Sequence, residues 1–313
     1  MPSHAGSPDP PILVSIVIPW CGEEELFETL RTLGSSNWFE VIVVDNRRHP
    51  VEVALGPFPF LVHEPVPGAA AARNRGVREA RGEFVFFLDA DCVPQEGWVV
   101  EMLQRMTELD ADGMQGPIQS RQKEAVARYI QAEFDQRQER LARHGRISLV
   151  STGNCAFRRA VLEAGGGFNP SLRAGEDTEF SFRLQGYGYQ LYYTASPAVW
   201  HRHPTRALAL LRRKFRYGFY LARVYRQYRG RIAENTRSPR SQLLAIGLWA
   251  LLLPALWLGG WKSGLVLVGL LMATAFPLVR RGGILALLLF PLCTLMNTLG
   301  LFCGWFWPSR PAC

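Results

Sequence analysis

The chain has 313 residues, which is room for one large domain or two ordinary ones, and its 48% hydrophobic and 20% charged residues exclude a wholly disordered or collagen-like protein. The formal net charge of +8 combines two unlike parts: residues 1–202 carry 20 basic and 26 acidic side chains, whereas residues 203–313 carry 15 basic and 1 acidic. The composition therefore predicts an acidic globular part followed by a basic, apolar part.

Residues 1–11 form a polar, Pro-rich tail that we expect to be disordered and that lacks the apolar core of a signal peptide. The next segment alternates short apolar runs with amphipathic or Ala-rich runs. This pattern predicts an α/β domain over residues 12–202, built on an open, mostly parallel sheet of Rossmann-like type. Strands are predicted over 14–19, 39–44, 84–88, 149–157 and 189–193, and helices over 23–33, 69–80, 124–144 and from residue 179.

The character of the sequence changes at residue 203. Residues 203–240 carry 11 Arg or Lys and one acid, with Leu, Phe and Tyr between the charges, which predicts a basic amphipathic segment at a membrane interface. Residues 241–313 contain no Asp or Glu and hold three apolar blocks, at 243–260, 265–279 and 284–307. Because a span needs roughly 20 apolar residues, we expect about three transmembrane helices. The second block is short, so two spans or a re-entrant hairpin is the alternative, and a buried soluble bundle is a further one.

Arginines beside a long apolar stretch are typical of a cytoplasmic membrane collar. They account for the basic net charge, and no nucleic-acid-binding motif accompanies them, so no nucleic acid is expected as a partner. The six cysteines are scattered without a CxxC pair, which predicts reduced thiols. We therefore expect a multi-pass protein of the cell membrane whose N-terminal domain lies in the cytoplasm.

Two acidic clusters are the candidates for chemistry. Asp89-Ala90-Asp91 follows the aromatic-rich strand 84–88, and Asp45 ends the preceding strand. Ligands of open α/β sheets bind at the carboxyl ends of the strands, and paired carboxylates there can hold a divalent cation that phosphate oxygens also bind. The second cluster, Gly175-Glu176-Asp177-Thr178-Glu179, lies at a helix start, where capping and dipole interactions are the structural alternative.

A series of motifs in order makes the sequence similar to a known family. They are Val14–Pro19 (VSIVIP), Val43-Val44-Asp45-Asn46, Gly68–Arg81 (GAAAARNRGVREAR), Phe86–Asp91 (FFLDAD), Gly153–Arg159 (GNCAFRR), Gly166-Gly167-Phe168 and Gly175-Glu176-Asp177. Together they resemble the family-2 glycosyltransferases of the GT-A fold over roughly residues 12–220. The resemblance implies a GT-A-type domain followed by C-terminal transmembrane helices.

The resemblance also implies roles for individual residues on the donor side. Pro19 and Asp45 would line the nucleotide pocket, with Asp45 accepting a hydrogen bond from the base. Arg73 would reach the base or ribose, and Asp89 would lie near the ribose and a metal-bound water. These four residues are the implied contacts of a nucleotide-sugar donor.

Further implied roles concern the metal and the acceptor. Asp91 would ligate Mg or Mn bridging the diphosphate, with Asp89 and His201 as additional metal contacts. Asp177 would be the general base for the acceptor hydroxyl, and Glu176 would help to position it. His203 is a weaker candidate for the same region.

These roles agree with what the chemistry requires. A cation neutralises the charge that builds on the leaving diphosphate, and a carboxylate must take the proton of a weakly nucleophilic hydroxyl. A single displacement inverts the anomeric centre. The expected activity is therefore an inverting, metal-dependent transfer of one sugar from a UDP- or GDP-sugar to a hydroxyl or phosphate acceptor. The membrane part suggests a membrane lipid or lipid-linked acceptor at the cytoplasmic face of the bilayer.

Two departures from the family pattern stand out. Processive members carry Gln-x-x-Arg-Trp, whereas residues 212–218 read Arg-Arg-Lys-Phe-Arg-Tyr-Gly, which favours one sugar per binding event. Asp45 is followed by Asn46-Arg47-Arg48 where many relatives continue with an acid, Gly and Ser, so the contact after Asp45 is open.

Three other functions are weighed against this one. A sugar nucleotidyltransferase would need a Gly-rich loop after the first strand, but residues 20–25 are acidic with a single Gly. A dehydrogenase would need the dinucleotide fingerprint, which Gly186-Tyr187-Gly188 does not supply. A membrane scaffold with a degenerate domain would not require the intact Asp91 and Asp177.

Overall fold

The computed structural model describes residues 12–50, 53, 55, 60–229 and 240–307. The predicted tail 1–11, residues 230–239 of the predicted interfacial segment, and the end of the chain with Arg310 and Cys313 lie outside the described residues.

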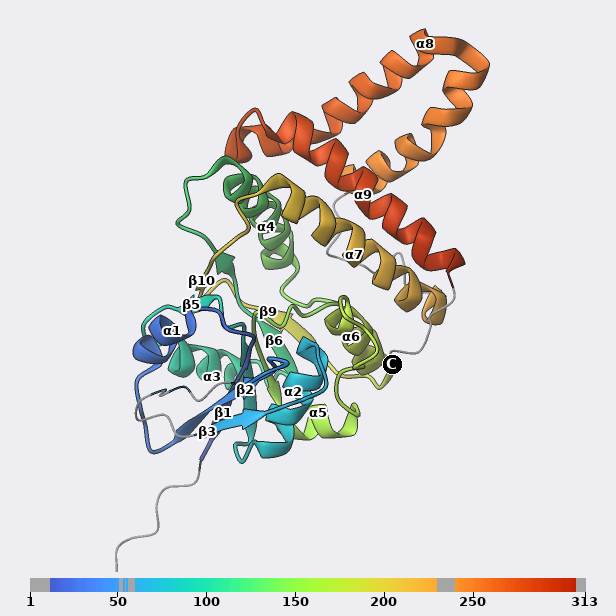
Figure 1. Ribbon diagram of the computed structural model, residues 1–313. Helices are drawn as coiled ribbons and strands as arrows, with labels where there is room; N and C mark the ends of the chain where they lie inside the picture. Colours follow the sequence, from blue (N-terminus) through green and yellow to red (C-terminus); the bar gives the residue numbers. More distant parts are fainter. Residues whose placement is uncertain (1–11, 51–52, 54, 56–59, 230–239, 308–313) are drawn as a thin grey trace, which may run out of the picture.

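The N-terminal part is built on a seven-stranded sheet with the order β3-β2-β1-β4-β8-β6-β9 (Figure 1). Its strands are β1 (Val14–Trp20), β2 (Phe39–Asp45), β3 (Phe60–His63), β4 (Phe84–Leu88), β6 (Gly113–Gln115), β8 (Asn154–Arg158) and β9 (Leu191–Tyr193). β1 pairs in parallel with β2 and β4, and β2 with β3, whereas β8 is antiparallel to β4 and β6. The predicted α/β fold with a mostly parallel sheet is confirmed.

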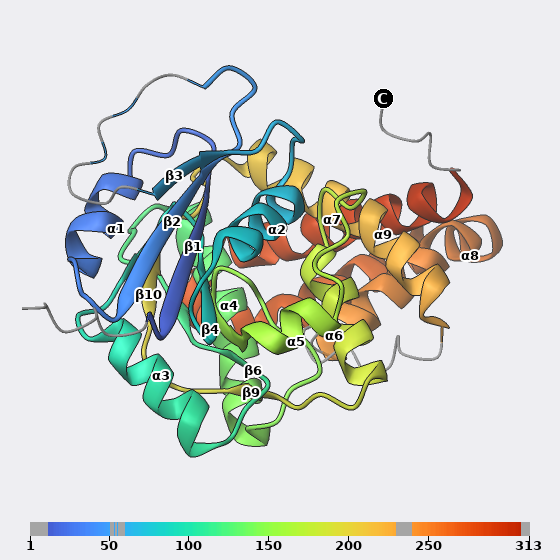
Figure 2. The same ribbon diagram turned by 90° about the horizontal axis from the view of Figure 1, so that it is seen from below.

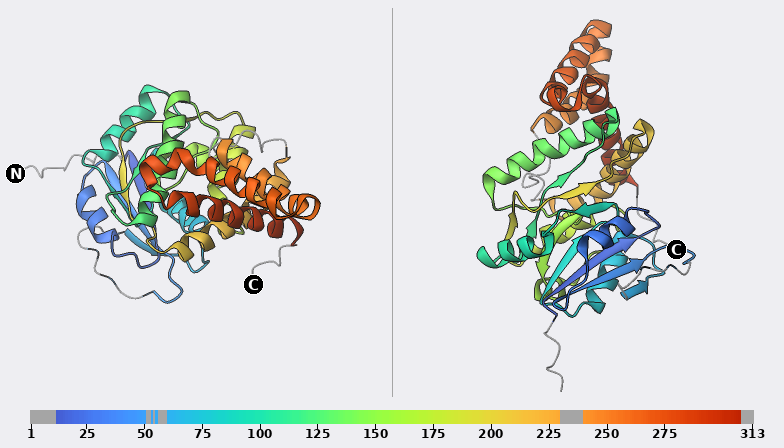
Figure 3. Two further views of the ribbon diagram at one scale, coloured as in Figure 1. Left: turned by 90° about the horizontal axis from the view of Figure 1, so that it is seen from above. Right: turned by 90° about the vertical axis from the view of Figure 1, so that its left-hand side faces the viewer.

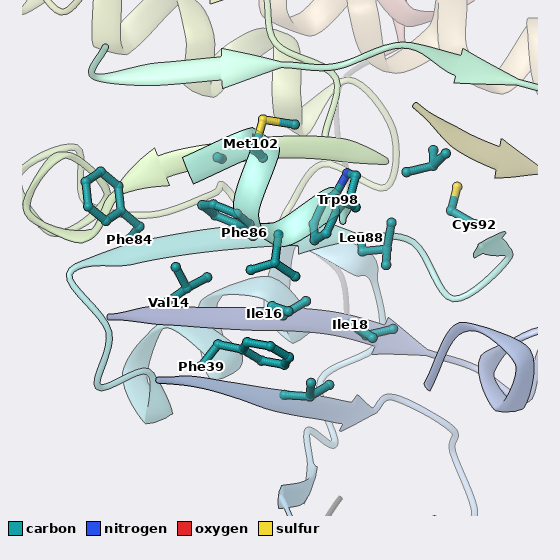
Figure 4. Close-up of a cluster of buried hydrophobic side chains, with 14 of the residues drawn as sticks. Val14, Ile16, Ile18, Phe39, Phe84, Phe86, Leu88, Cys92, Trp98 and Met102 are labelled. Carbon is teal, nitrogen blue, oxygen red and sulfur yellow. The ribbon is translucent and has the colours of Figure 1, made fainter. Parts of the chain in front are cut away.

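Alternating side chains of the central strands fill two cores on opposite faces of this sheet. Phe84, Phe86 and Leu88 of β4 enter one core together with Trp98 and Met102 (Figure 4). Helices α1 (Leu26–Leu33) and α3 (Trp98–Glu108) cover that face. Val85 and Phe87 point into the other core, under α2 (Ala69–Glu79), α5 (Arg159–Ala164) and α6 (Glu176–Gly186) (Figure 2). Both faces are buried, which explains why the central strands are apolar throughout.

Two predicted boundaries are wrong, and α3 was not predicted. The strand expected over 149–157 is confined to β8, because the amide of Val150 binds Ser181 Oγ and that of Ser151 binds Gln115 Oε1 instead of a neighbouring strand. Helix α6 begins at Glu176 and not at residue 179. Gly175 supplies the left-handed residue before it, with φ of 77°.

A second, three-stranded sheet lies beside the carboxyl end of β4. It consists of β5 (Cys92–Pro94), β10 (Val199–His201) and β7 (Ile118–Gln119) in the order β5-β10-β7. The antiparallel register pairs His201 with Cys92. His201 is thereby brought next to Asp91, although 110 positions separate the two in sequence.

The remaining helices connect this domain to an apolar extension (Figure 3). They are α4 (Ala125–His144), α7 (Ala207–Gln227), α8 (Arg240–Gly282) and α9 (Ala286–Phe306). The first two predicted apolar blocks fall in α8, a 43-residue helix that Figure 1 shows as two arms meeting far from the sheet. Within the described residues, Trp261–Gly282 and Ala286–Phe306 are long and apolar enough to cross a membrane. The second block is therefore longer than expected, and the count of three spans stays a prediction.

Helix α7 packs against α9 at backbone distance. A Cβ added at Gly300 would lie 2.1 Å from the carbonyl oxygen of Phe215, and one at Gly304 would lie 2.0 Å from that of Phe219. The other side of α7 contributes Leu221 and Val224 to a cluster with residues of the sheet domain. Only glycine permits this approach, so α7 is clamped between the domain and an apolar helix.

We expect the substitution Gly300→Ala to destabilise the protein, because the added methyl group must push α7 and α9 apart. Overpacking of this kind costs about 1–3 kcal/mol, which is measurable as a lower Tm in detergent micelles. Gly269→Ala in α8 is the matched control, since a Cβ there meets nothing within 4 Å. Equal melting temperatures for the two variants would contradict the close packing.

Candidate active site

A buried arginine holds the two acidic clusters together. Arg73, on α2, is 3% exposed; its Nη2 donates to Asp89 Oδ1 and its Nη1 donates to Glu176 Oε1, both at 2.8 Å. Burial alone would lower the pKa of Arg73, but the charges of Asp89, Glu176 and Asp177 raise it above its ordinary value. The guanidinium therefore stays charged and joins the end of β4 to the start of α6.

The second cluster is arranged by the first turn of α6. Asp177 Oδ1 accepts a 2.6 Å hydrogen bond from the amide of Thr178, and its charge acts on both Arg73 and Glu176. Burial and the charge of Asp177 raise the pKa of Glu176 in spite of Arg73. Glu176 is thus paired with Arg73. The half-buried Asp177 beside it is the carboxylate that could interact with a substrate.

Asp91 and His201 form the candidate metal centre. His201 Nε2 lies 3.3 Å from Asp91 Oδ2, and the amide of Arg202 donates to the carbonyl of Asp91 at 3.1 Å. Burial would raise the pKa of Asp91, but the hydrogen bond and charge of His201 and the charge of Arg213 outweigh it and keep that pKa below its usual range. Asp91 is therefore ionised and available as an oxygen ligand.

Asp91, Cys92 and His201 have ligand atoms within 4.8 Å of one another, so the donor set can be tested against the implied cation. Burial raises the pKa of the Cys92 thiol well above its usual range, and its Sγ donates to Asp91 at 3.8 Å. Mg and Mn prefer oxygen and accept imidazole. Asp91 and His201 fit such a cation, whereas Cys92 remains a protonated neighbour.

Asp45 lies at the end of β2, but its carboxylate is already paired. Arg47 donates to it through the backbone amide (3.0 Å), Nε (2.9 Å) and Nη2 (2.8 Å), while its guanidinium lies 4.1 Å above the Trp20 ring. Burial would raise the pKa of Asp45, but these hydrogen bonds lower it. The implied contact between Asp45 and a base therefore requires Arg47 to move, and it stays a prediction.

Pro19 falls where the strand pairing of β1 becomes one-sided. β1 pairs with β2 as far as Trp20 but with β4 only as far as Val17. A proline lacks the amide that a two-sided strand would use, so it is tolerated here. The half-buried ring lies at the same strand edge as Asp45.

A cleft of about 1110 Å³ opens beside the candidate metal centre. Asp91 and His201 line it together with Trp200, Arg121 and residues of α1 such as Glu28. Arg121 stacks on Trp200 at 4.0 Å. The cleft does not reach Asp45, Arg73 or Asp177, so it adds space on one side of the metal centre only.

The sequence matches a known family model, described as glycosyl transferase family 2, over residues 15–166. It is also 31% identical to the succinoglycan biosynthesis protein ExoM of Rhizobium meliloti, an alignment that covers 62% of this chain and 69% of that protein. The chain belongs to glycosyl transferase family 2.

Other members of family 2 extend this comparison. The pre-mycofactocin glycosyltransferase of Mycobacterium tuberculosis is 31% identical over 66% of this chain, and the chain spans about half of that relative (46%). Glycosyltransferase AglE of Haloferax volcanii is 28% identical, with 66% of this chain and 71% of that protein aligned. The fold matches the mannosyltransferase PcManGT from Pyrobaculum calidifontis, solved with GDP-Man and Mn2+, with a TM-score of 0.64, 17% identity and coverage of 97% and 91%. This confirms the expected GT-A-type fold.

The structure brings most of the predicted site residues of this family member together in two groups of contacting side chains. Arg73, Asp89 and Glu176 are in direct contact, with Asp177 beside them, and Asp91 is in contact with His201. Pro19 lies one strand away from β4, on β1, and Asp45 lies two strands away, at the end of β2. The roles of all these residues remain predictions.

Local sequence patterns offer little sign of two other contributors. Arg47 stands out only as a departure from the family pattern, and no motif marks Gln131, which hydrogen-bonds His203 at 2.8 Å. The pairing of Gln131 depends on how α4 faces β10, which no local pattern reveals.

We expect Arg73→Met to lower the stability of the fold and to separate the two acidic clusters. Removing one partner of a buried charge pair leaves the other uncompensated and costs about 3 kcal/mol or more. Arg75→Met on the same helix is the control, because Arg75 makes a half-exposed pair with Glu79 that is worth about 0–1 kcal/mol. Thermal unfolding in detergent measures both; equal losses would show that Arg73 is not the link.

Proposed function

We propose that this chain is an inverting, metal-dependent glycosyltransferase that moves one sugar from a nucleotide-diphosphate sugar to a hydroxyl or phosphate acceptor. The acceptor is lipid-linked, and the reaction takes place at the cytoplasmic face of the cell membrane. The observation that carries the proposal is the bridge from Asp89 through Arg73 to Glu176. It brings the acidic cluster of the metal side and that of the base side into one site.

The donor would bind along the strand edge formed by Pro19, Asp45 and Asp89. Asp91 and His201, with Asp89 nearby, would hold Mg or Mn. When bound, this cation neutralises charge on the diphosphate and makes it a better leaving group. The GDP-Man and Mn2+ of the mannosyltransferase neighbour support a donor and a cation of this kind.

The base side supplies the second half of the displacement. Asp177, ionised beside Arg73, accepts the proton of the acceptor hydroxyl as its oxygen bonds to the anomeric carbon. The bond from that carbon to the diphosphate oxygen breaks, and the electron pair leaves with the nucleotide diphosphate. Because the oxygen attacks from the face opposite the leaving group, the product has inverted configuration. Glu176 is held by Arg73 and keeps the start of α6 in place.

We expect purified protein in detergent to release a nucleoside diphosphate from a UDP- or GDP-sugar when Mn and a lipid-linked sugar with a free hydroxyl are present, and to stop when EDTA is added. Asp177→Asn should lower the turnover about 10²–10⁴-fold, the usual contribution of a general base, while donor affinity stays nearly constant. Asp110→Asn, an exposed acid paired with Arg158, is the control. A collapse of donor affinity with unchanged turnover would make Asp177 a binding residue.

The proposed membrane topology follows from charge and from one contact. Arg281, at the end of α8, donates to Glu139 of α4 at 2.6 Å, so this end lies on the side of the catalytic domain. Lys262 lies close to the middle of α8, and Figure 1 shows the two arms of α8 meeting far from the sheet. Basic residues favour the cytoplasmic side, which supports a catalytic domain on that side and Lys262 on the opposite one.

In a variant whose native cysteines are replaced, we expect Lys262→Cys to react with an impermeant maleimide on intact cells. Arg280→Cys, near the domain side, should react only after permeabilisation. The reverse labelling pattern, or no labelling at either position, would contradict the proposal that each arm of α8 crosses the bilayer.

A further inference from the structure

A chain of four side chains runs from the candidate metal centre into helix α4. Asp91 Oδ2 lies 3.3 Å from His201 Nε2, and His201 Nδ1 lies 2.8 Å from His203 Nδ1. His203 Nε2 in turn lies 2.8 Å from Gln131 Oε1. Each of these contacts is within hydrogen-bond reach or close to it, so the position of every proton depends on the next partner.

Gln131, at the inner end of this hydrogen-bonded series, sets the direction of proton donation. The amide nitrogen of Gln131 donates to the carbonyl of Ile118 at 3.1 Å and to Asp135 Oδ1 at 2.7 Å, which leaves Oε1 as the acceptor. His203 Nε2 must therefore carry a proton and donate it to Gln131.

His203 is held in place by its surroundings. The side chain is 2% exposed, its ring lies 5.2 Å from that of Phe134, and its ring nitrogens contact His201 and Gln131. Gln122 also fixes the backbone of His203, accepting from its amide at 2.5 Å and donating to its carbonyl at 3.0 Å.

His201 Nδ1 is engaged by His203, so His201 can present only Nε2 to Asp91. We propose that Gln131 and His203 are positioning residues that fix the ring orientation of His201, so that its Nε2 faces a divalent cation held at Asp91. This inference rests on the metal dependence in the proposed function.

Such a role has a general physical basis. Histidines that ligate metals usually donate their other ring nitrogen to a fixed acceptor, and removing that acceptor weakens metal binding about 10–100-fold. Here the partner of the other ring nitrogen is a second histidine, and α4 supplies the group that orients it. The candidate metal centre is thereby connected to the helix that also packs against α8.

Helix α4 offers a matched pair of variants for the test. Gln131→Met removes the acceptor of His203 and keeps an unbranched side chain of similar length. Gln138→Met makes the same change two turns later on α4, at a buried residue that hydrogen-bonds both backbone groups of Ile118 but not His203. Both variants lose contacts to Ile118, and Gln131→Met also loses the hydrogen bond to Asp135. Of the two glutamines, only Gln131 contacts His203.

Binding of Mn²⁺ alone to the full chain in detergent is measured by loss of the free-ion EPR signal. We expect Gln131→Met to weaken Mn²⁺ binding about 10–100-fold, with Gln138→Met within about twofold of the parent and Asp91→Asn without binding.

A second measurement reads the donated proton directly. In protein labelled with ¹⁵N-histidine and free of metal, we expect His203 Nε2 to show the shift of a protonated nitrogen, and Gln131→Met to alter it. Equal Mn²⁺ affinities of Gln131→Met and Gln138→Met, or a His203 whose Nε2 carries no proton, would overturn the inference. If the Mn²⁺ pattern holds while no sugar nucleotide is turned over, the proposed function fails and this inference stands.

Discussion

The buried guanidinium of Arg73 is the constraint on which the rest of the site depends. A charge that is 3% exposed must find anionic partners, because its desolvation is otherwise uncompensated. Asp89 and Glu176 are those partners, and they come from the end of β4 and the start of α6. The ion pairs therefore do more than stabilise α2. They fix the distance between the strand edge that carries Asp89 and the helix start that carries Asp177.

The same site is connected to the apolar helices through packing that leaves little freedom. The glycines of α9 admit α7 at backbone contact, and Lys214 of α7 donates to Glu133 of α4 at 2.8 Å. Arg281 joins the end of α8 to α4. Because α7 follows directly after β10, the strand of His201, a displacement of the apolar helices is transmitted to the candidate metal centre over a few residues of chain.

The fold and the location of the site could be predicted from sequence because they follow from local patterns. Apolar runs gave the strands, and carboxylates at strand ends had to meet at one edge, as Asp45 and Asp89 do. Pairings that depend on tertiary packing could not be predicted, as the chain from His203 to Gln131 shows. Asn74, part of a family motif, proved to bind the backbone of Phe168 through both amide atoms, so here the motif carries structure.

The balance of charge around the site explains why a cation belongs to the proposed mechanism. Five carboxylates, those of Asp45, Asp89, Asp91, Glu176 and Asp177, lie near three guanidinium groups, those of Arg47, Arg73 and Arg213. Even with Glu176 protonated, the carboxylates outnumber the guanidinium groups, and His203 is neutral there because burial lowers its pKa to about 3. A diphosphate brought to this edge would meet like charge, which is costly where water is partly excluded. In the proposed mechanism, a divalent cation held by Asp91 and His201 would reverse that sign, so the carboxylates that would repel the bare diphosphate would favour its binding together with the metal.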